Sequence, residues 1–386
     1  MKLPPRIVVA LGLVSLFTDM ASEMVYPLLP RLVAVLGAGA WWLGAIEGVG
    51  DATAAILKLY SGKLADRVHR RKPLALAGYA LSNVVRPMVV LAAAPWQIVV
   101  VRFVDRIGKG IRSSPRDALL AASGPLERSA ATFGFHRAMD NLGATLGPLL
   151  VVGGLWLWDG DIQKILLASA VPGLLAVLTL SLFVQEDAPV PSVRPVSSMV
   201  AGPPPEALRS YLLILGAFSV TNTSDLFLLR RLEELGAPTS RVALFWALLS
   251  GVRALSGFPG GLLADRIGRT RSLMLGWLLY AVAYGIMASA PSLTIFLPGF
   301  FAYGLFYGFT EGAERAIVAT LAPRPVLGAA FGRFHMITGI AMLPSNLIFG
   351  LAWDRWGGPV CLAVSATGSL LALGTLALWS RRHGSG

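Results

Sequence analysis

Two apolar segments near the start of the chain carry carboxylates at positions where these groups could exchange protons. Asp19 and Glu23 lie four residues apart in the first segment, and Glu47 and Asp51 repeat that spacing in the second. On a helix this spacing places both members of a pair on one face. A carboxyl group in an apolar environment takes up a proton rather than remain charged. The four acids are therefore candidate sites of proton coupling.

The fourth apolar segment, residues 96–114, and the residues directly after it carry mostly cations, and these share one helix face. At roughly 100° per residue they fall within a stripe of about 120°. A charge that faces lipid at mid-membrane costs at least ~2.5 kcal/mol, so the stripe must face protein or a water-filled cavity. Arg102 and Asp105 join the coupling candidates, and Arg106 and Lys109 are candidates for substrate binding. The members of the stripe are Arg102, Asp105, Arg106, Lys109, Arg112 and Arg116.

Structural explanations of these charges remain open. Buried acids and bases also form static ion pairs between helices. Lys109, Arg112 and Arg116 could instead emerge into the cytoplasm at the end of their segment. His136, in the fifth apolar segment, could relay protons near neutral pH or be a hydrogen-bonded residue at a helix interface.

The second half of the chain is less charged, so it is expected to contribute more to the substrate surface than to coupling. Polar and aromatic side chains there are candidates for solute contact, although aromatic side chains also serve helix packing. The candidate substrate-binding residues besides Arg106 and Lys109 are Tyr26, Asn222, Asp225, Trp246 and Tyr307.

An internal repeat organises the elements that carry these residues. Residues 62–72 return as residues 261–271, an offset of 261 − 62 = 199, about half of the chain. Two like halves in the same orientation, each with an even number of spans, form parallel repeats around an axis along the membrane normal. The matching positions are Gly62 and Gly261, Asp66 and Asp265, Arg67 and Arg266, and Arg70 and Arg269.

Composition indicates a membrane protein. The 386 residues are 55% hydrophobic and only 14% charged, more apolar surface than one water-soluble core can bury. Apolar runs of roughly 20 residues, the length that crosses a bilayer as a helix, predict twelve spans. We expect a six-helix bundle over 1–184, a cytoplasmic linker over 185–208 that is rich in Pro and Ser, and a second six-helix bundle over 209–386.

Charge sets the expected orientation and excludes other classes. The loop after the second span carries Lys63, Arg67, Arg70, Arg71 and Lys72, whereas residues 93–95 and 290–292 carry no cation. By the positive-inside rule both termini are then cytoplasmic. The net charge of +12 lies at membrane edges, which argues against nucleic-acid binding. The lone Cys361 excludes an internal disulfide, and no ligand spacing supports a metal site.

The repeated loop resembles the signature between helices 2 and 3 of the major facilitator superfamily, Gly-x-Leu-Ala-Asp-Arg-x-Gly-Arg, with His69 in place of the second Gly in the first copy. The resemblance implies that the loop gates the cytoplasmic side, with Asp66 and Asp265 as latches; a role in topology and folding alone is the alternative. Residues 102–110 resemble the helix 4 motif, whose Arg, here Arg102, is linked to proton transfer. Gly143, Gly147 and Pro148 resemble the antiporter motif of helix 5, which implies a gating joint.

These observations predict a secondary transporter of the bacterial inner membrane that moves a small organic solute by alternating access, with proton-coupled export favoured. A proton-coupled or facilitative importer of a small organic anion is the alternative, and a non-transporting receptor or scaffold is the alternative of another class. We expect no enzymatic activity, because the chain has no phosphate-binding loop and no nucleophile triad. The expected partners are protons, the solute and the bilayer; no cofactor is expected, and the chain is expected to be a monomer.

Overall fold

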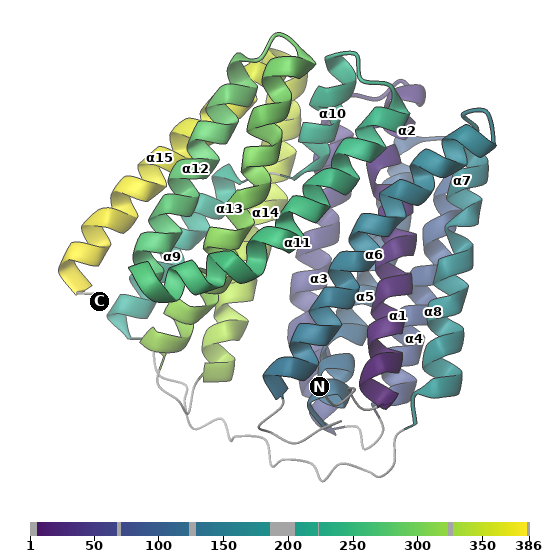
Figure 1. Cartoon of the computed structure of the whole chain (residues 1–386), viewed down its shortest axis with the longest axis horizontal. Helices are drawn as coiled ribbons and strands as arrows, with labels where there is room; N and C mark the ends of the chain where they lie inside the picture. The colour runs from purple at the N-terminus through teal and green to yellow at the C-terminus, as the bar shows by residue number, and fades with distance from the viewer. Residues whose placement is uncertain are drawn as a thin grey trace. The chain divides into compact units, whose positions relative to one another are not determined.

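The structure is a computed structural model in which the described part of the chain folds into helices, with no strand (Figure 1). Apolar runs separated by short polar loops favour this outcome, because a helix satisfies its own backbone hydrogen bonds within a bilayer. The described residues are 6–67, 71–122, 129–185, 205–222, 224–322 and 327–383.

The first half contains long helices and shorter pieces at proline-rich positions. Two 3₁₀ segments, η1 and η2, begin where Pro27 and Pro87 lack the N–H that would continue an α-helix. The elements are α1 (Arg6–Val25), η1 (Tyr26–Leu28), α2 (Leu29–Val35), α3 (Trp41–Arg67), α4 (Lys72–Val85), η2 (Arg86–Leu91), α5 (Pro95–Ala122), α6 (Ser129–Leu157), α7 (Ile162–Ala168) and α8 (Ala170–Phe183).

The second half repeats this pattern with fewer breaks. Its first span is again divided in two, and its other spans are single helices. The elements are α9 (Glu206–Thr221), α10 (Leu226–Glu234), α11 (Thr239–Ile267), α12 (Arg269–Ser289), α13 (Leu293–Leu321), α14 (Leu327–Trp356) and α15 (Gly358–His383).

Ten helical stretches within the described ranges are long and apolar enough to cross a membrane. The helices α3 and α5, of 27 and 28 residues, are long enough but are not among these ten. Both carry several charged residues within their apolar runs, and these include six of the predicted site residues. With these two helices the expected twelve-span, all-helical fold is confirmed.

The first span of each half is interrupted at matching positions. In the first half the break is η1, which starts at Tyr26, and in the second it lies between α9 and α10, around Asn222 and Asp225. Tyr26 and Asp225 differ by 225 − 26 = 199, the offset of the sequence repeat. Breaks at corresponding positions of two transporter repeats point to a ligand site, because they expose backbone groups and side chains inside the bundle.

Contacts between Cα atoms divide the chain into two compact units. One unit comprises Met1–Gly37, Val49–Ser197 and Thr239–Ala247. In this unit α1 packs along α6 and α8, and α4 packs along α5. Apolar side chains of α1, α4, α5 and α8, among them Leu11 and Tyr79, form its core.

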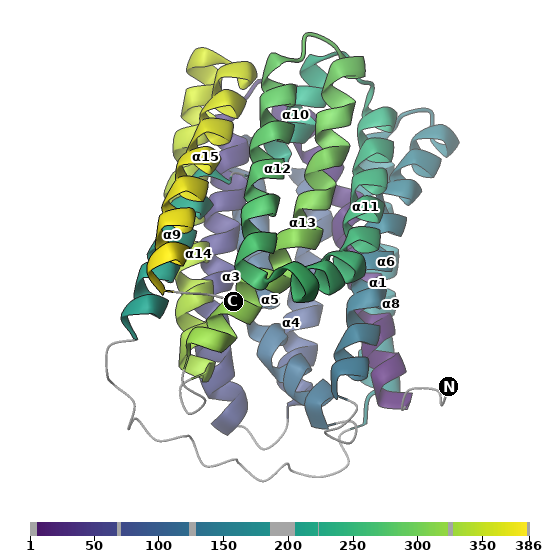
Figure 2. The ribbon, with the colours of Figure 1, turned by 60° about the vertical axis from the view of Figure 1, so that its left-hand side comes forward.

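The other unit comprises Ala38–Gly48, Ser198–Pro238 and Leu248–Gly386. In it α12 packs on α13 and α15, as Figures 1 and 2 show. Stacked aromatic rings fill its interior; the ring centroids of Phe218 and Trp277 are 4.3 Å apart and those of Tyr280 and Tyr284 are 4.0 Å apart.

Each unit includes the start of a helix from the opposite sequence half. The start of α3 belongs to the second unit, where Asp354 of α14 accepts hydrogen bonds from the backbone N–H groups of Ala40 (2.6 Å) and Trp41 (2.9 Å). A carboxylate is favourable at this helix N-terminus because the first N–H groups have no partner inside the helix. The expected bundles over 1–184 and 209–386 follow the two halves of the sequence, and this division remains a prediction.

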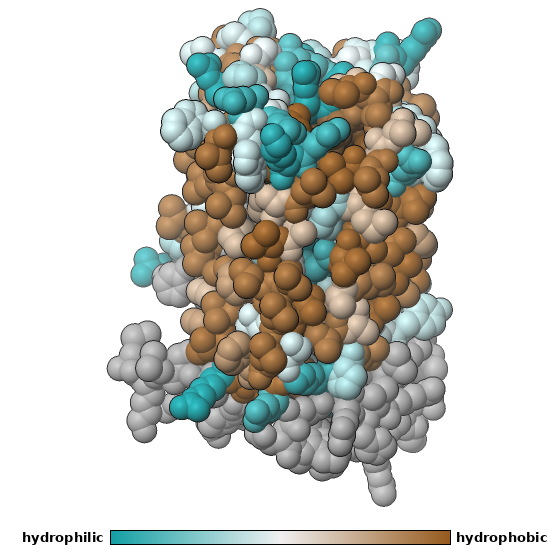
Figure 3. Space-filling model, turned by 90° about the vertical axis from the view of Figure 1, so that its right-hand side faces the viewer, coloured by the Kyte–Doolittle hydropathy of each residue, from teal (hydrophilic) through white to brown (hydrophobic). Residues whose placement is uncertain are grey.

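The outward surface is apolar over a broad band. Figure 3 shows this band on one face, with hydrophilic side chains gathered above it. Exposed apolar residues of α6 and α8 include Trp156 (85% exposed), Leu174 and Leu182. Such side chains are stable when they face hydrocarbon rather than water, as the membrane prediction requires.

Candidate functional site

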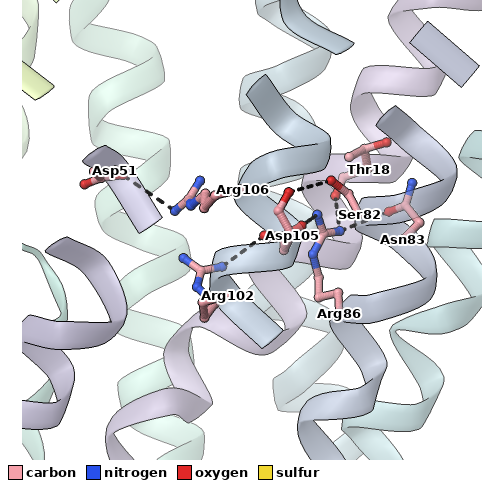
Figure 4. A network of polar contacts seen from close by, with 8 residues as sticks. All are labelled: Thr18, Asp51, Ser82, Asn83, Arg86, Arg102, Asp105 and Arg106. Atoms are coloured by element: carbon pink, nitrogen blue, oxygen red, sulfur yellow. Dashed lines mark hydrogen bonds and ion pairs between the residues drawn. The ribbon is translucent and has the colours of Figure 1, made fainter. Parts of the chain in front are cut away.

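A cluster of buried charges lies in the first unit, centred on Asp105 of α5 (Figure 4). Arg86 donates a hydrogen bond of 2.8 Å to Asp105 Oδ1, and Arg102 lies 3.5 Å from Asp105 Oδ2. These three residues are at most 3% exposed. Two guanidinium groups thus share the Asp105 carboxylate in a buried environment, where hydrogen bonds and ion pairs offset the cost of burying charge.

Close helix packing brings Arg86 and Asp105 together. A Cβ added at Gly108 of α5 would lie 2.5 Å from Ser82 Oγ and 2.6 Å from the carbonyl oxygen of Gly78, so only glycine permits this approach of α4 and α5. Ser82 also donates a hydrogen bond of 2.8 Å to the carbonyl oxygen of Asp105.

Arg86 has further partners that fix its position. It starts η2, and its Nη1 donates to the carbonyl oxygen of Thr18 in α1 (3.1 Å) and to Asn83 Oδ1 (3.0 Å). The guanidinium thereby connects α1, α4 and α5. Hydrogen bonds to carbonyl and carboxylate oxygens compensate the cost of burying the charge.

Arg106 extends the charge cluster toward α3. Its Nη2 lies 3.9 Å from Asp51 Oδ1, and the two side chains are 11% and 31% exposed. Gly50 leaves room for this contact, because a Cβ there would lie 3.1 Å from Arg106 Cγ. The Arg106 and Asp51 side chains are thus more accessible than those of Arg86 and Asp105.

Glu23 lies beside aromatic side chains in the same unit. The indole N–H of Trp246 donates a hydrogen bond of 2.7 Å to Glu23 Oε2. The rings of Tyr26 and Trp246 stack at 5.1 Å, and the Arg102 guanidinium lies 5.9 Å from the Tyr26 ring centroid. The structure therefore brings together four residues that the sequence analysis had placed in two roles, coupling and solute binding.

Asp19 faces a second group of ionisable residues. The charges that act on it most strongly are those of Asp140 in α6 and of Lys109, Arg112 and Arg116 in α5. Asp140 accepts a short hydrogen bond from Ser15 and lies 3.6 Å from His136 Nδ1. His136 is thus held at a buried helix interface.

The second unit has its own ion pair at the break between α9 and α10. Both Nη atoms of Arg253 donate to the carboxylate of Asp225, each at 3.0 Å. Tyr303 Oη donates to Asp225 Oδ1 at 2.8 Å, and the Tyr307 hydroxyl lies 2.8 Å from that of Tyr303. The Arg253 guanidinium also lies 4.2 Å from the Tyr307 ring centroid, within cation–π range.

Two further predicted residues are placed by their helices. Asn222 ends α9, where its backbone N–H bonds to the carbonyl oxygen of Phe218. Glu47 is buried on α3, in the segment that belongs to the second unit, whereas Asp51 belongs to the first. The spacing of the two acids on one helix therefore does not bring them into one compact unit.

The glycines of the predicted antiporter motif lie against α1. A Cβ at Gly147 would lie 2.7 Å from Glu23 Cβ and 2.7 Å from the carbonyl oxygen of Met20, and one at Gly143 would overlap the carbonyl oxygen of Leu16. Pro148 follows Gly147 within α6. These residues let α6 approach α1 at the level of Asp19 and Glu23.

The repeated loop is described only in part. Arg266 and Arg269 are exposed near the end of α11 and the start of α12, and a Cβ at Gly261 would meet no atom within 4 Å. The structure does not describe the surroundings of the other candidates in this loop: Gly62, Asp66, Arg67, Arg70 and Asp265.

Sequence reasoning missed Arg86 and left Asp140 and Arg253 without a role. The signal for Arg86 was present, because it is the lone cation in the apolar run from residue 74 to residue 92. An isolated cation inside a span requires a buried partner. Across the described residues no three His, Cys, Asp or Glu side chains form a group that could hold a metal ion.

Comparison with known proteins points to one family. The model of the major facilitator superfamily matches residues 11–252 and 210–386. An MFS-type transporter of Methanocaldococcus jannaschii is 31% identical over 353 residues, which cover 89% of this chain and 87% of that protein. The multidrug resistance protein MdtL of Shigella flexneri is 29% identical over 309 residues, which cover 76% and 75% of the two chains.

A solved structure agrees at the level of the fold. The bacterial homologue of the human lysosomal transporter Spinster has a TM-score of 0.79 at 17% identity, and the match covers 99% of this chain and 98% of that one. At this identity the likeness concerns the arrangement of helices alone.

Proposed function

Because this chain belongs to the major facilitator superfamily of membrane transporters, we propose that it is a secondary active transporter that exports a small organic solute in exchange for protons. The solute carries an anionic group, and two like bundles give it access to each side of the membrane in turn. The proton gradient supplies the energy, so the protein uses no cofactor. The chain works as a monomer in the bacterial inner membrane, with both termini in the cytoplasm.

The observation that carries this proposal is the buried charge cluster around Asp105. Arg86 and Arg102 lie beside its carboxylate, and Arg106 follows on the next turn of the same helix. The 3.9 Å contact of Arg106 with Asp51 is the most exposed ion pair of the cluster, so an anionic group can compete with Asp51 for this guanidinium. A planar guanidinium matches the geometry of a carboxylate or phosphate.

Accessibility assigns different roles to the cations. Arg86, at 3% exposure, is bound to three helices and is a positioning residue for Asp105. Arg106 and Asp51 are partly open, so Arg106 binds the anionic group of the solute when that group competes with Asp51. Arg102 is 2% exposed, and its guanidinium lies 5.9 Å from the Tyr26 ring centroid.

Glu23 is the proposed proton site. Its carboxylate accepts a hydrogen bond from Trp246, and Arg102 contacts the neighbouring Tyr26 ring. A proton on Glu23 removes the charge that the Trp246 N–H and nearby cations stabilise. For exchange, the solute must also present a hydrogen-bond donor or a cationic group to the Glu23 carboxylate, because this contact favours the deprotonated state and is lost when the proton binds.

Export is favoured over import by two observations. The relative MdtL is named a multidrug resistance protein, and the chain carries glycines of the antiporter type at the contact of α6 and α1. A proton-coupled or facilitative importer of a small organic anion would use the same cations, so direction requires a transport experiment.

The test is transport by purified protein in liposomes with an imposed pH gradient and a mixture of labelled organic anions. The wild-type protein should move at least one solute against its gradient in exchange for protons, and Asp19→Asn and Glu23→Gln should abolish this uphill movement. The matched control is Asp161→Asn, which neutralises an exposed N-cap carboxylate outside the spans.

Asp161 is a suitable control because backbone N–H groups, chiefly that of Lys164, hold the pKa of its carboxyl below the ordinary value. It therefore stays charged across the applied pH range, and asparagine can replace it as a helix cap. Cotransport in the direction of the protons would show the importer. Absence of any gradient-driven flux in wild-type protein would leave the receptor or scaffold alternative.

A further inference from the structure

A cavity of about 490 Å³ lies in the second unit, at the end of the bundle where α11 ends and α12 begins. The end of α13 and the last turns of α15 complete its walls, through Thr320 and Trp379. The cavity is separate from the ion pair of Arg253 and Asp225, whose residues do not line it. None of the residues proposed for solute binding or proton coupling lines it.

Three arginines line this cavity, and all three are exposed: Arg266, Arg269 and Arg271. No carboxylate is among the described residues that line it. The side chain of Asp265 lies outside the described part, but even with this acid the segment 265–271 has a net charge of 3 − 1 = +2. The cavity is therefore basic.

Hydroxyl groups and an apolar wall complete the lining. Arg269 Nη1 donates a hydrogen bond of 2.5 Å to Thr320 Oγ1, which directs this guanidinium across the cavity to α13. Leu321 and Trp379 provide apolar surface beside the cations. The indole N–H of Trp379 donates to Ser210 at 2.9 Å and its ring stacks on His383 with centroids 5.2 Å apart, so Trp379 forms a fixed, largely buried part of the apolar wall.

The backbone adds to the positive character. Gly268 precedes α12 with φ of +94° and has no side chain, so the backbone at the start of a 21-residue helix lies at the cavity wall. The positive end of a helix dipole favours anions, phosphate among them.

We propose that this cavity binds the phosphate group of an anionic lipid at the membrane interface. The guanidinium groups of Arg266, Arg269 and Arg271 bind the phosphate oxygens, and Leu321 and Trp379 contact the glycerol and the start of the acyl chains. Basic pockets between membrane helices at the interface suit such headgroups, because charge and apolar contact are available together. A free phosphate compound shares the chemistry of the headgroup and differs only in lacking the acyl chains.

The sequence of the first copy of the repeated loop differs at the glycine turn. At the position of Gly268 the first copy has His69, and a φ of +94° is strained for any residue with a Cβ. Residues 68–70 lie outside the described part, so this contrast rests on the sequence and on the turn at Gly268.

The test is native mass spectrometry of the full chain titrated with phosphatidylglycerol, phosphatidylcholine or inorganic phosphate. Wild-type protein should retain phosphatidylglycerol about tenfold more tightly than phosphatidylcholine, a difference of about 1.4 kcal/mol. The triple variant Arg266→Gln, Arg269→Gln, Arg271→Gln should lose this preference. The control variant Arg209→Gln, Arg381→Gln, Arg382→Gln removes the same charge from α9 and α15 outside the cavity and should keep it.

A second measurement on wild-type protein covers the case in which the triple variant does not fold. Phosphatidylglycerol should protect the three cavity arginines from modification by phenylglyoxal while Arg381 and Arg382 react at an unchanged rate. Protection by inorganic phosphate equal to that by the lipid would support the phosphate site and identify a free compound as its ligand. Equal loss of lipid in both triple variants, or no protection of the cavity arginines by either probe, would overturn the proposal.

Discussion

At the scale of single residues, the charges around Asp105 differ in what they do. Arg86 donates hydrogen bonds to Thr18, Asn83 and Asp105. This geometry requires the several N–H donors of a planar guanidinium and not a positive charge alone. Arg106 is partly open to solvent at the edge of the cluster. We therefore assign Arg86 to the scaffold and Arg106 to the solute.

This assignment predicts that Arg86→Gln destabilises the protein strongly. Removal of one partner leaves Asp105 buried beside fewer cations, which typically costs about 3–5 kcal/mol in unfolding free energy. Thermal unfolding in detergent measures the effect, and Arg86→Lys should recover only part of it because lysine lacks the fork. The matched control is Lys164→Gln, which breaks an exposed pair with Asp161 and should change little. Equal melting temperatures for the Arg86 and Lys164 variants would contradict the scaffold role.

Sequence alone could identify the residues of the cluster better than their pairing. The stripe on α5 indicated Arg102, Asp105 and Arg106 as inward-facing, and the structure places all three on the buried network. The partner of Asp105 could not be predicted, because Arg86 is on another helix and its approach depends on Gly78 and Gly108. A contact between two distant segments produces no recognisable pattern in the local sequence of either segment.

At the scale of helices, the contact of α6 with α1 connects gating to coupling. Gly143 and Gly147 bring the α6 backbone onto the stretch of α1 that carries Asp19 and Glu23. Any change in the distance between these helices would move the carboxyl groups directly.

Gly147→Ala should therefore reduce both stability and transport. The added methyl group would meet Glu23 and Met20, and such overpacking costs about 1–3 kcal/mol. The matched control on the same helix is Gly153→Ala, because a Cβ there meets no atom within 4 Å. Thermal unfolding and solute flux should both separate the two variants. If the two alanine variants behave alike, the close contact of α6 and α1 is not a functional feature.

The helical elements themselves were largely predictable. Apolar runs gave their number, and charged segments such as 96–114 were recognisable despite their low hydropathy because the charges share one face. The ends were less predictable: α5 continues to Ala122, beyond the predicted 114, because an apolar run marks the part of a helix in hydrocarbon and not the end of the helix. The break at Tyr26 follows from Pro27, and the matching break near Asp225 became meaningful only through the repeat.

At the scale of the whole molecule, the two halves have diverged in chemistry while keeping their helices. The first unit contains the charge cluster around Asp105, and the second contains the pair of Arg253 and Asp225 beside tyrosines. Matching breaks in the first span of each half place Tyr26 and Asp225 at equivalent positions. The division of labour expected from the sequence, coupling in the first half and more of the solute contact in the second, stays a prediction.

The predicted orientation can be checked by single-cysteine labelling. In a Cys361→Ser background, cysteines at Arg71 and Gly268 should react with a membrane-impermeant thiol reagent only after cell lysis, because cationic loops stay in the cytoplasm. Cysteines at Ala93 and Asp161 should react in intact cells. The native Cys361 is buried at 2% exposure, so its removal should not affect the labelled loops. The reverse labelling pattern would contradict cytoplasmic termini.

The central claim is that Glu23 couples proton movement to solute movement within one carrier. Its most direct test compares two fluxes of Glu23→Gln in the same liposomes: uphill transport driven by a pH gradient, and exchange of labelled for unlabelled solute without a gradient. Glutamine can neither bind nor release a proton, whereas Arg106 still binds the anionic group of the solute, so solute exchange should persist while uphill transport is lost. Loss of both fluxes in a folded variant, or retention of both, would contradict the account.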